Sequence, residues 1–446
     1  MENNWYQYIG GCTEQYRTFP SRTLFNNSVS EDDLILKYQG IDIYEPLSLY
    51  VHIPFCRQLC LLSGSGSLIE HHYPKARAYV DALIDEIAFH GKLLSSKGQP
   101  VSVHFGGGTP NYLICDDLAD ILTAIERHFG LTDSTDLSIE LDPRLLRKAD
   151  VDGLAFQGFN GLTLSIFDFD PNVQMAINRM QTFELIEASV SDIRSNGIED
   201  LTFDLRYGLP RQTEESFEAT LEKAISLSPD RISISDYTYA NSTPPVQRKI
   251  DPKTLPDRHL RGRLAIIADE KLVSAGYVRV GFDHYAKASS SLSRSALSGQ
   301  FKRSLQGFSA DSAKSLIGFG VSAISFVDGL YLQNTPSVPN YLATVAAGHV
   351  PIESGLLRNK TDTVIANAID DILCRRTTNI SDVLNSAHPS DAIHISQRLE
   401  ALEKDNLIEW RGDRILVSKH ADAFSLVVAT ALDPYTDLPQ KIAAIV

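Results

Sequence analysis

Long apolar runs and closely spaced cysteines are both scarce in this sequence. No window approaches the ~20 apolar residues that a membrane-spanning helix needs, and the polar start lacks the basic flank and apolar core of a signal peptide. Only one close pair occurs among the five cysteines, Cys12, Cys56, Cys60, Cys115 and Cys374. This spacing excludes a disulfide framework. We therefore expect a cytoplasmic protein whose cysteine pair serves metal or redox chemistry.

A surplus of basic residues is also absent. The 446 residues contain 41 Lys and Arg against 56 Asp and Glu, so the net charge is -15. Phosphate binding relies on clustered Lys and Arg, which argues against nucleic acid or an anionic membrane as a partner. A local basic pocket could still hold an anionic small molecule.

Short β-rich runs alternate with helical runs between residues 47 and 286. The predicted strands are 47–53, 101–106, 136–141, 161–167, 200–207, 231–237 and 278–284, and the predicted helices are 74–94, 115–129, 144–156, 182–196, 214–227 and 255–275. Repeated strand–helix units indicate an α/β protein with a parallel sheet, either barrel-like or open and doubly wound. Functional-looking residues at the carboxyl ends of the strands favour the barrel type.

Composition divides the chain into three predicted parts. Residues 1–46 form a polar, aromatic arm, residues 47–286 form the barrel-like domain, and residues 287–446 form a mostly helical domain that begins with a Ser-rich stretch. A helix over 394–405 and strands over 407–410 and 414–417 predict a small winged-helix-like end. With this acidic balance we expect it to close the barrel rather than to bind nucleic acid.

The close cysteine pair lies in LSLYVHIPFCRQLCLLSGSG (47–66), spaced as Cys56-x3-Cys60-x2-Ser63. This stretch resembles the oxygen-independent coproporphyrinogen III oxidase family of radical S-adenosylmethionine (SAM) enzymes, whose signature is C-x3-C-x2-C. In that family three cysteines hold a [4Fe–4S] cluster, and the fourth iron binds SAM. Here Ser63 stands at the third position, and Ser65 stands where a further cysteine is common. A serine hydroxyl is a hard, weakly acidic substitute for a thiolate, so the motif argues against a complete cluster.

A second motif, Gly106-Gly107-Gly108-Thr109-Pro110, follows a predicted strand and precedes a helix. It resembles the family's GGGTP segment, which forms a wall of the SAM pocket. The resemblance implies SAM contacts at Tyr50, Gly107, Gly108, Thr109, Glu140, Arg179, Asp204, Thr238, Gln306 and Ile324. Two neighbours depart from the family: Phe167 replaces a glutamine that contacts SAM, and Leu62 replaces an aromatic residue beside the cluster.

The resemblance covers nearly the whole chain and implies a partial six-unit (β/α)6 barrel of the radical SAM type. The family's reaction is the SAM-dependent oxidative decarboxylation of two propionates of a tetrapyrrole to vinyl groups. Because the third cysteine is missing, we expect a non-radical paralogue in heme metabolism that binds a tetrapyrrole, SAM or both. The alternative is a working enzyme in which Ser63, Cys12 or a small ligand completes the cluster. A purely structural interaction protein is the third possibility, and we assign no catalytic residue.

The expected partner is a tetrapyrrole small molecule, either heme or another porphyrin, bound to a monomer. Its candidate anchors are Arg17, Arg22 and Arg179. Three histidines, His52, His104 and His284, are candidate heme or metal ligands, although a single histidine is more often a hydrogen-bonded core residue. Neither a nucleic acid nor a membrane is expected as a partner.

Overall fold

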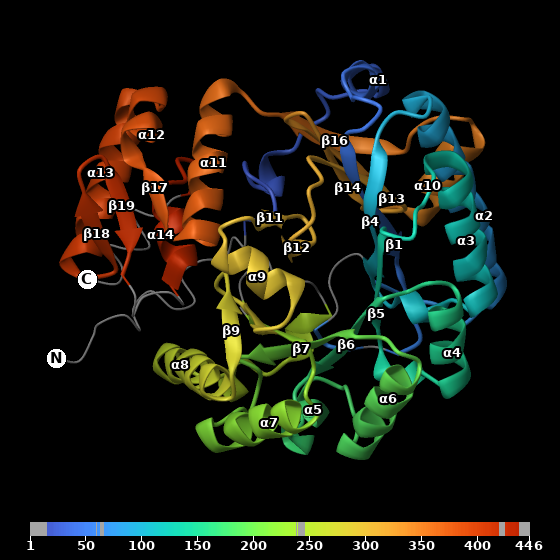
Figure 1. Cartoon of the computed structure of the whole chain (residues 1–446), viewed down its shortest axis with the longest axis horizontal. Coiled ribbons are helices and arrows are strands. Elements are labelled where there is room, and N and C mark those ends of the chain that lie inside the picture. The colour runs from blue at the N-terminus through green and yellow to red at the C-terminus, as the bar shows by residue number, and fades with distance from the viewer. Residues whose placement is uncertain are drawn as a thin grey trace.

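Six parallel strands that alternate with helices form the centre of the molecule (Figure 1). The computed structural model describes residues 16–58, 60–62, 67–237, 239, 246–418 and 424–436. The six strands, in their order across the sheet, are β1 (Pro46–Ile53), β4 (Gln99–Gly107), β5 (Asp136–Leu141), β6 (Gly161–Phe167), β7 (Asp200–Tyr207) and β8 (Arg231–Asp236). The helices that connect or follow them are α2 (Tyr73–Leu94), α3 (Cys115–Phe129), α4 (Lys148–Phe156), α5 (Pro171–Ala176), α6 (Phe183–Ser195), α7 (Glu214–Ser226) and α8 (Arg258–Ser274). The predicted barrel-type α/β fold is confirmed.

Alternation along each strand separates the apolar core from a polar interior. In β1, Leu49, Val51 and Ile53 are fully buried in the core that the sheet shares with α2. Tyr50 and His52, which lie between them, line a cavity on the opposite face. Because successive side chains of a strand point to opposite faces, one face packs on helices and the other directs functional groups inward.

Two predicted elements differ in the structure. The predicted strand 278–284 is a pair of antiparallel strands, β9 (Tyr277–Val280) and β10 (His284–Lys287), at the end of the sheet beyond β8. The turn between them needs Gly281, because its φ is +66° and a Cβ there would collide with the Phe308 ring. The predicted helix 144–156 begins only at Lys148, after a short 3-10 turn over Pro143–Leu145.

The region after residue 286 contains more strand than its sequence predicts. It begins with α9 (Ser291–Leu297) and a hairpin of β11 (Lys302–Ser304) and β12 (Gly307–Ser309). Four strands then extend the main sheet on the other side of β1, namely β13 (Ser315–Phe319), β14 (Ile324–Val327), β15 (Leu330–Asn334) and β16 (Ile352–Leu357). β13 is buried along its whole length, and periodicity does not distinguish such an apolar run from a buried helix. The domain boundary at residue 286 stays a prediction.

The helical part of the C-terminal region has its own core and lies beside the barrel, at the left of Figure 1. Its elements are α11 (Lys360–Arg375), β17 (Thr377–Asn379), α12 (Ile380–Ser386), α13 (Pro389–Lys404), β18 (Ile408–Arg411), β19 (Arg414–Val417) and α14 (Ser425–Ala431). The predicted helix 394–405 and its two strands are present as α13, β18 and β19, with β17 completing a small sheet. Within the described ranges, none of the helices is long and apolar enough to cross a membrane.

The chain before the barrel contains α1 (Glu31–Gln39), and α10 (Val338–Ala346) packs near it against α2. Residues 16–20 extend toward the C-terminal region. The Tyr16 hydroxyl donates a hydrogen bond to Asp433 Oδ2 at 3.0 Å, and Arg358 Nε donates one to the Phe19 carbonyl at 2.6 Å. Contacts with residues far along the chain therefore hold this arm.

Candidate functional site

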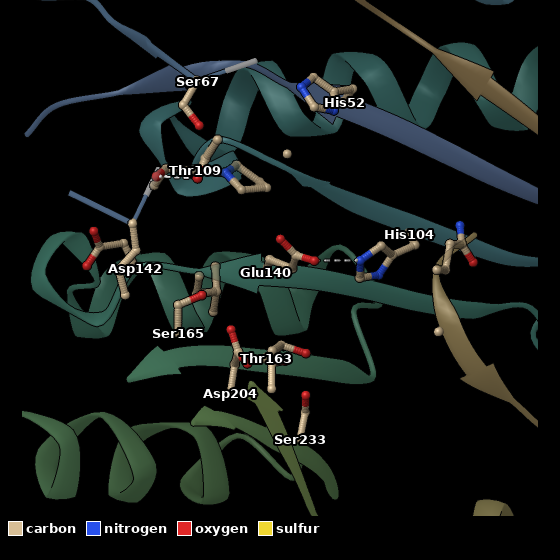
Figure 2. Close-up of a pocket in the computed structure, with 18 of the residues that line it drawn as sticks. His52, Ser67, His104, Thr109, Glu140, Asp142, Thr163, Ser165, Asp204 and Ser233 are labelled. Atoms are coloured by element: carbon tan, nitrogen blue, oxygen red, sulfur yellow. Dashed lines mark hydrogen bonds and ion pairs between the residues drawn. The ribbon is translucent and has the colours of Figure 1, made fainter. Parts of the chain in front are cut away.

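A cavity of about 800 Å³ occupies the inside of the barrel. Its walls come from the inward-facing residues of the parallel strands, from the arm, and from the β11–β12 hairpin. Figure 2 shows Thr163, Ser165, Asp204 and Ser233 gathered from three neighbouring strands, with Glu140 close by. The interior is thus hydroxylic and charged rather than apolar.

The cavity brings together nearly every site residue that the sequence predicts. The lining includes Cys56, Cys60, Tyr50, Gly107, Gly108, Thr109, Glu140, Arg179, Asp204, Gln306 and Ile324. Thr238 and Ser63 lie outside the described residues, as do Ser65 and Cys12. Their roles, and the ligand contacts of the residues that line the cavity, stay predictions.

Two hydrogen-bonded pairs lie on the inward faces of β1, β4 and β5. Tyr50 Oη and His52 Nδ1 are 3.0 Å apart, and His104 Nε2 lies 3.4 Å from Glu140 Oε1 (Figure 2). Burial lowers the pKa of His52 to about 4. Burial opposes ionisation of Glu140, but the hydrogen bond and charge of His104 hold its pKa below the ordinary value. At neutral pH this wall therefore carries the neutral imidazole of His52 and the carboxylate of Glu140.

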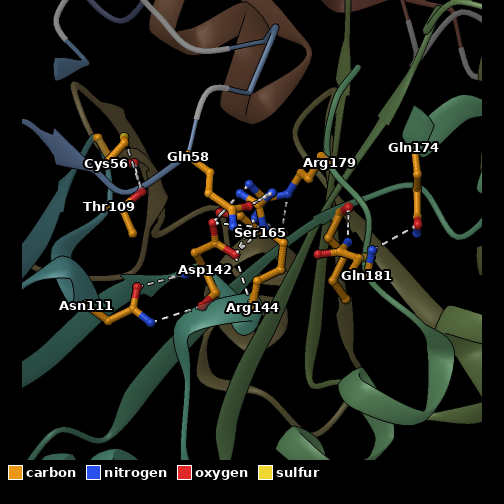
Figure 3. A network of polar contacts seen from close by, with 12 residues as sticks. Cys56, Gln58, Thr109, Asn111, Asp142, Arg144, Ser165, Gln174, Arg179 and Gln181 are labelled. Carbon is orange, nitrogen blue, oxygen red and sulfur yellow. Dashed lines mark hydrogen bonds and ion pairs between the residues drawn. The ribbon is translucent and has the colours of Figure 1, made fainter. Parts of the chain in front are cut away.

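The cysteine loop enters the cavity from the end of β1, where β2 (Phe55–Cys56) pairs with β3 (Leu68–Ile69). Cys56 Sγ hydrogen-bonds with Thr109 Oγ1 at 3.4 Å (Figure 3), and burial raises the pKa of this thiol. Gly108 permits the glycine turn to lie close to the start of the cysteine loop, because a Cβ at Gly108 would lie 2.5 Å from the Pro54 carbonyl oxygen.

The donors described around this loop do not fit a cluster held by three thiolates. Cys60 and Leu62 are buried in a small apolar cluster with Phe167 and Leu209. In the described part of the chain, no group of three or more His, Cys, Asp or Glu side chains could hold a metal ion. The sequence offers Ser63 at the third position. The loop therefore provides two protein thiols, one of them packed among apolar side chains.

Arginines below the loop form a network around Asp142 (Figure 3). Arg144 Nη2 donates to Asp142 Oδ2 at 2.6 Å, and Arg179 Nη1 donates to the same oxygen at 3.3 Å. Arg179 also donates twice to the Ser165 carbonyl. Burial works against the Asp142 carboxylate, but its bonds with Arg144 and the charge of Arg179 keep its pKa low. Arg179, predicted as an anchor for a ligand carboxylate, thus already has a protein carboxylate as its partner.

Phe167 has an unusual backbone and an unusual neighbourhood. Its φ is +70°, which is rare for a bulky residue, and the β6–β7 register shifts between Ser165 and Phe167. The guanidinium carbons of Arg179 and Arg206 each lie 4.6 Å from the centre of its ring. Phe167 is recognisable in the sequence as a departure from the family, whereas Arg206 is not among the predicted site residues. The alternation Thr202, Asp204, Arg206 along β7 was the available signal.

The arm and the β11–β12 hairpin contribute residues to the lining of the cavity. Arg17 and Arg22, both predicted anchors, line it, together with Arg303 and the pair Asp283–His284, whose Oδ1 and Nδ1 atoms are 2.6 Å apart. Burial disfavours the Asp283 carboxylate, yet the charge of His284 lowers its pKa. His52, His104 and His284 all line the cavity, and each is a partner in a hydrogen bond, while their candidate role as heme or metal ligands stays a prediction.

Residues 50–224 match the family model of the Radical SAM superfamily. The fold and the site therefore define a protein of the radical SAM class. The chain is 31% identical over 425 residues to an oxygen-independent coproporphyrinogen III oxidase from Bradyrhizobium diazoefficiens, covering 95% of this chain and 94% of the relative. It is 32% identical over 437 residues to the enzyme of that name from Salmonella typhimurium, covering 96% and 94% of the two chains. The chain belongs to the oxygen-independent coproporphyrinogen III oxidase family.

A solved structure agrees with this assignment. The coproporphyrinogen III oxidase from Escherichia coli, described as a radical SAM enzyme, superposes with a TM-score of 0.88 at 29% identity. The match covers 95% of this chain and 98% of that one. The similarity therefore includes the arm and the C-terminal region as well as the barrel, and it supports a coproporphyrinogen III oxidase-like role in heme biosynthesis.

Proposed function

We propose that this protein is a non-radical member of its family that binds a tetrapyrrole in the barrel cavity. The family's enzymes are named for coproporphyrinogen III, a tetrapyrrole with acidic side chains. We therefore expect this protein to bind the same kind of ligand as its relatives but not to catalyse their oxidation reaction. Two features of this chain support it: the charge of the cavity and the donor set of the cysteine loop.

The charge of the cavity is the observation that carries the proposal. The lining contains seven arginines and four carboxylates, an excess of three positive charges, in a protein whose net charge is -15. The arginines are Arg17, Arg22, Arg57, Arg144, Arg179, Arg206 and Arg303, and the carboxylates are Glu140, Asp142, Asp204 and Asp283. Guanidinium groups suit carboxylates because their donors match both oxygens of the acid. A ligand with several carboxylates therefore fits this cavity better than a neutral one.

The donor set of the loop supports a role without radical chemistry. A cluster needs soft thiolate ligands, and the described loop offers Cys56 and Cys60 alone. Cys56 is held by Thr109, and Cys60 is packed against apolar side chains. We infer that binding, transfer or regulation within heme metabolism replaces oxidation.

The glycine turn supports SAM as a second ligand. Gly107 and Gly108 remain at the cavity wall, where backbone groups can meet a bound molecule without obstruction by side chains. Phe167, which has no hydrogen-bonding group, lines the same cavity. We therefore expect a tetrapyrrole, rather than SAM, to be the main ligand of the cavity.

The alternative is an active oxygen-independent oxidase in which Ser63, Cys12 or a small molecule supplies the missing ligand. The extent of the match to enzymes with that name favours it. The iron content of the anaerobically reconstituted protein distinguishes the two functions.

The direct test is a titration of the cluster-free protein with coproporphyrin III and with heme. Binding is followed through the Soret band and through quenching of tryptophan fluorescence. The control is an unrelated acidic protein of similar net charge. We expect saturable binding with a dissociation constant in the micromolar range or below. A constant no tighter than that of the control would overturn the proposal and favour an interaction protein.

A further inference from the structure

Arg206 is a cavity residue whose polar groups the protein leaves largely unused. It follows Thr202 and Asp204 on the inward face of β7, and its side chain is 29% exposed. Its closest carboxylate oxygen, Asp204 Oδ2, is 3.7 Å from Nη2, beyond hydrogen-bonding distance. Among the described residues, its Nε is buried without an acceptor. Asp204 partly balances the charge of Arg206 as an ion pair, but the described residues leave its Nη donors available for hydrogen bonds.

Arg179 provides an internal comparison, because its guanidinium lies over the same phenyl ring. Its donors are used on Asp142 and on the Ser165 carbonyl, and its side chain is 6% exposed. Both guanidiniums lie 4.6 Å from the ring of Phe167. The two arginines thus have the same aromatic contact, but only Arg206 presents unused donors to the cavity.

Phe167 holds Arg206 in this position. The residue has a φ of +70°, a conformation that a phenylalanine adopts at an energetic cost and that the surrounding structure must enforce. Phe167 as a whole is 9% exposed, and it packs in the apolar cluster that includes Cys60 and Leu62. Stacking on a fixed ring restricts the guanidinium plane, so less side-chain entropy is lost when a ligand binds.

We propose that Arg206, positioned by Phe167, binds one carboxylate of the ligand in this cavity. The inference rests on the proposed function, since it assigns a contact to the same ligand. A carboxylate can accept two parallel hydrogen bonds from a guanidinium, and the restricted plane favours this arrangement. SAM also has one carboxylate, but its sulfonium and ammonium groups give it a net positive charge, which an additional guanidinium disfavours. The pair Phe167–Arg206 therefore selects an anionic tetrapyrrole over SAM.

The test compares ligands that differ only in their acidic groups. Coproporphyrin III and its tetra-amide derivative are titrated into the wild type, Arg206→Gln, Arg206→Lys and Arg127→Gln. Arg127 is an exposed arginine on α3, away from the cavity lining, so its substitution removes the same charge without touching the site. Thermal denaturation and circular dichroism establish that each variant is folded.

Loss of a charge-assisted contact should weaken the binding of coproporphyrin III to Arg206→Gln by about 10-fold or more. The tetra-amide should bind the wild type and Arg206→Gln equally. Arg206→Lys should recover part of the affinity, and Arg127→Gln should behave as the wild type. Equal weakening of both ligands, or unchanged affinity for coproporphyrin III, would overturn the inference and leave the proposed function standing.

A second probe separates the two proposals. Benzene-1,2,4,5-tetracarboxylate carries four carboxylates without a tetrapyrrole ring, and its binding is measured by calorimetry on the same variants. Binding of this probe that depends on Arg206, with no porphyrin binding, would support the carboxylate site and overturn the tetrapyrrole function. Binding of neither molecule to the wild type would overturn both.

Discussion

Replacement of Glu86 on α2 should destabilise the fold in a pH-dependent way. This carboxyl group is 1% exposed and accepts three hydrogen bonds, from the Tyr341 hydroxyl at 2.6 Å, the Gly320 amide at 2.7 Å and Asn334 Nδ2 at 2.7 Å. Glu86→Ala leaves three buried donors without an acceptor. At about 1 to 2 kcal/mol for each donor, we expect a loss of about 3 to 6 kcal/mol in the free energy of unfolding.

The size of this loss should vary with pH. Burial raises the pKa of Glu86 from 4.5 to about 7 in the folded protein. The folded state therefore keeps its proton while the unfolded state ionises, so the stability contributed by this group is complete below about pH 4.5 and declines as pH rises toward 7. A difference of about 2.5 units corresponds to about 3 kcal/mol. The gap between wild type and Glu86→Ala should thus be larger at pH 5 than at pH 8.

Urea denaturation followed by circular dichroism at pH 5 and pH 8 measures both quantities. Glu126→Ala, at an exposed position of α3, is the matched control and should change the free energy of unfolding by less than about 0.5 kcal/mol at either pH. A gap that widens from pH 5 to pH 8 would refute the raised pKa. A gap at pH 5 no larger than that of the control would refute the role of the three hydrogen bonds.

Three further outcomes follow from the site. After anaerobic reconstitution with iron and sulfide, the protein should hold far less than four irons per chain and release no 5′-deoxyadenosine from SAM under reducing conditions; a stoichiometric cluster with SAM turnover would contradict this. Ser63→Cys should increase iron incorporation but restore little decarboxylation, because Leu62 and Phe167 still occupy the cavity wall; full activity of this single variant would show that the other departures are unimportant. Tyr16→Phe removes the hydroxyl that donates to Asp433, and it should weaken coproporphyrin III binding several-fold with little change in melting temperature; unchanged affinity would show that the arm does not contribute to binding.

Regular patterns in the sequence were sufficient to predict the strand–helix alternation, and the family resemblance indicated several residues of the cavity lining. The strands carry period-two alternation, and the cysteine loop and glycine turn follow strands β1 and β4, so the parallel sheet brings them together at one edge. Gly107, Glu140 and Asp204 therefore line the same cavity as the cysteine loop.

The remaining features depend on contacts that no local pattern reveals. Glu86 lies on a helix where a charged residue usually indicates a solvent-facing position, and its partner Tyr341 is 255 residues away. Arg206 would be expected to point to solvent, unless the strand alternation is combined with the position of Phe167 across the sheet. The left-handed backbone conformation of Phe167 accompanies a register shift between β6 and β7, and the sequence alone does not predict this shift.

The attachment of the arm sets an order of events during synthesis. Arg17 and Arg22 line the cavity on a segment whose Tyr16 and Phe19 contact Asp433 and Arg358, and these contacts form only after the late residues have been translated. All six parallel strands precede residue 237, so their sequence is translated well before these contacts can form. A chain that ends before Asp433 therefore lacks one of the contacts that hold the arm beside the cavity.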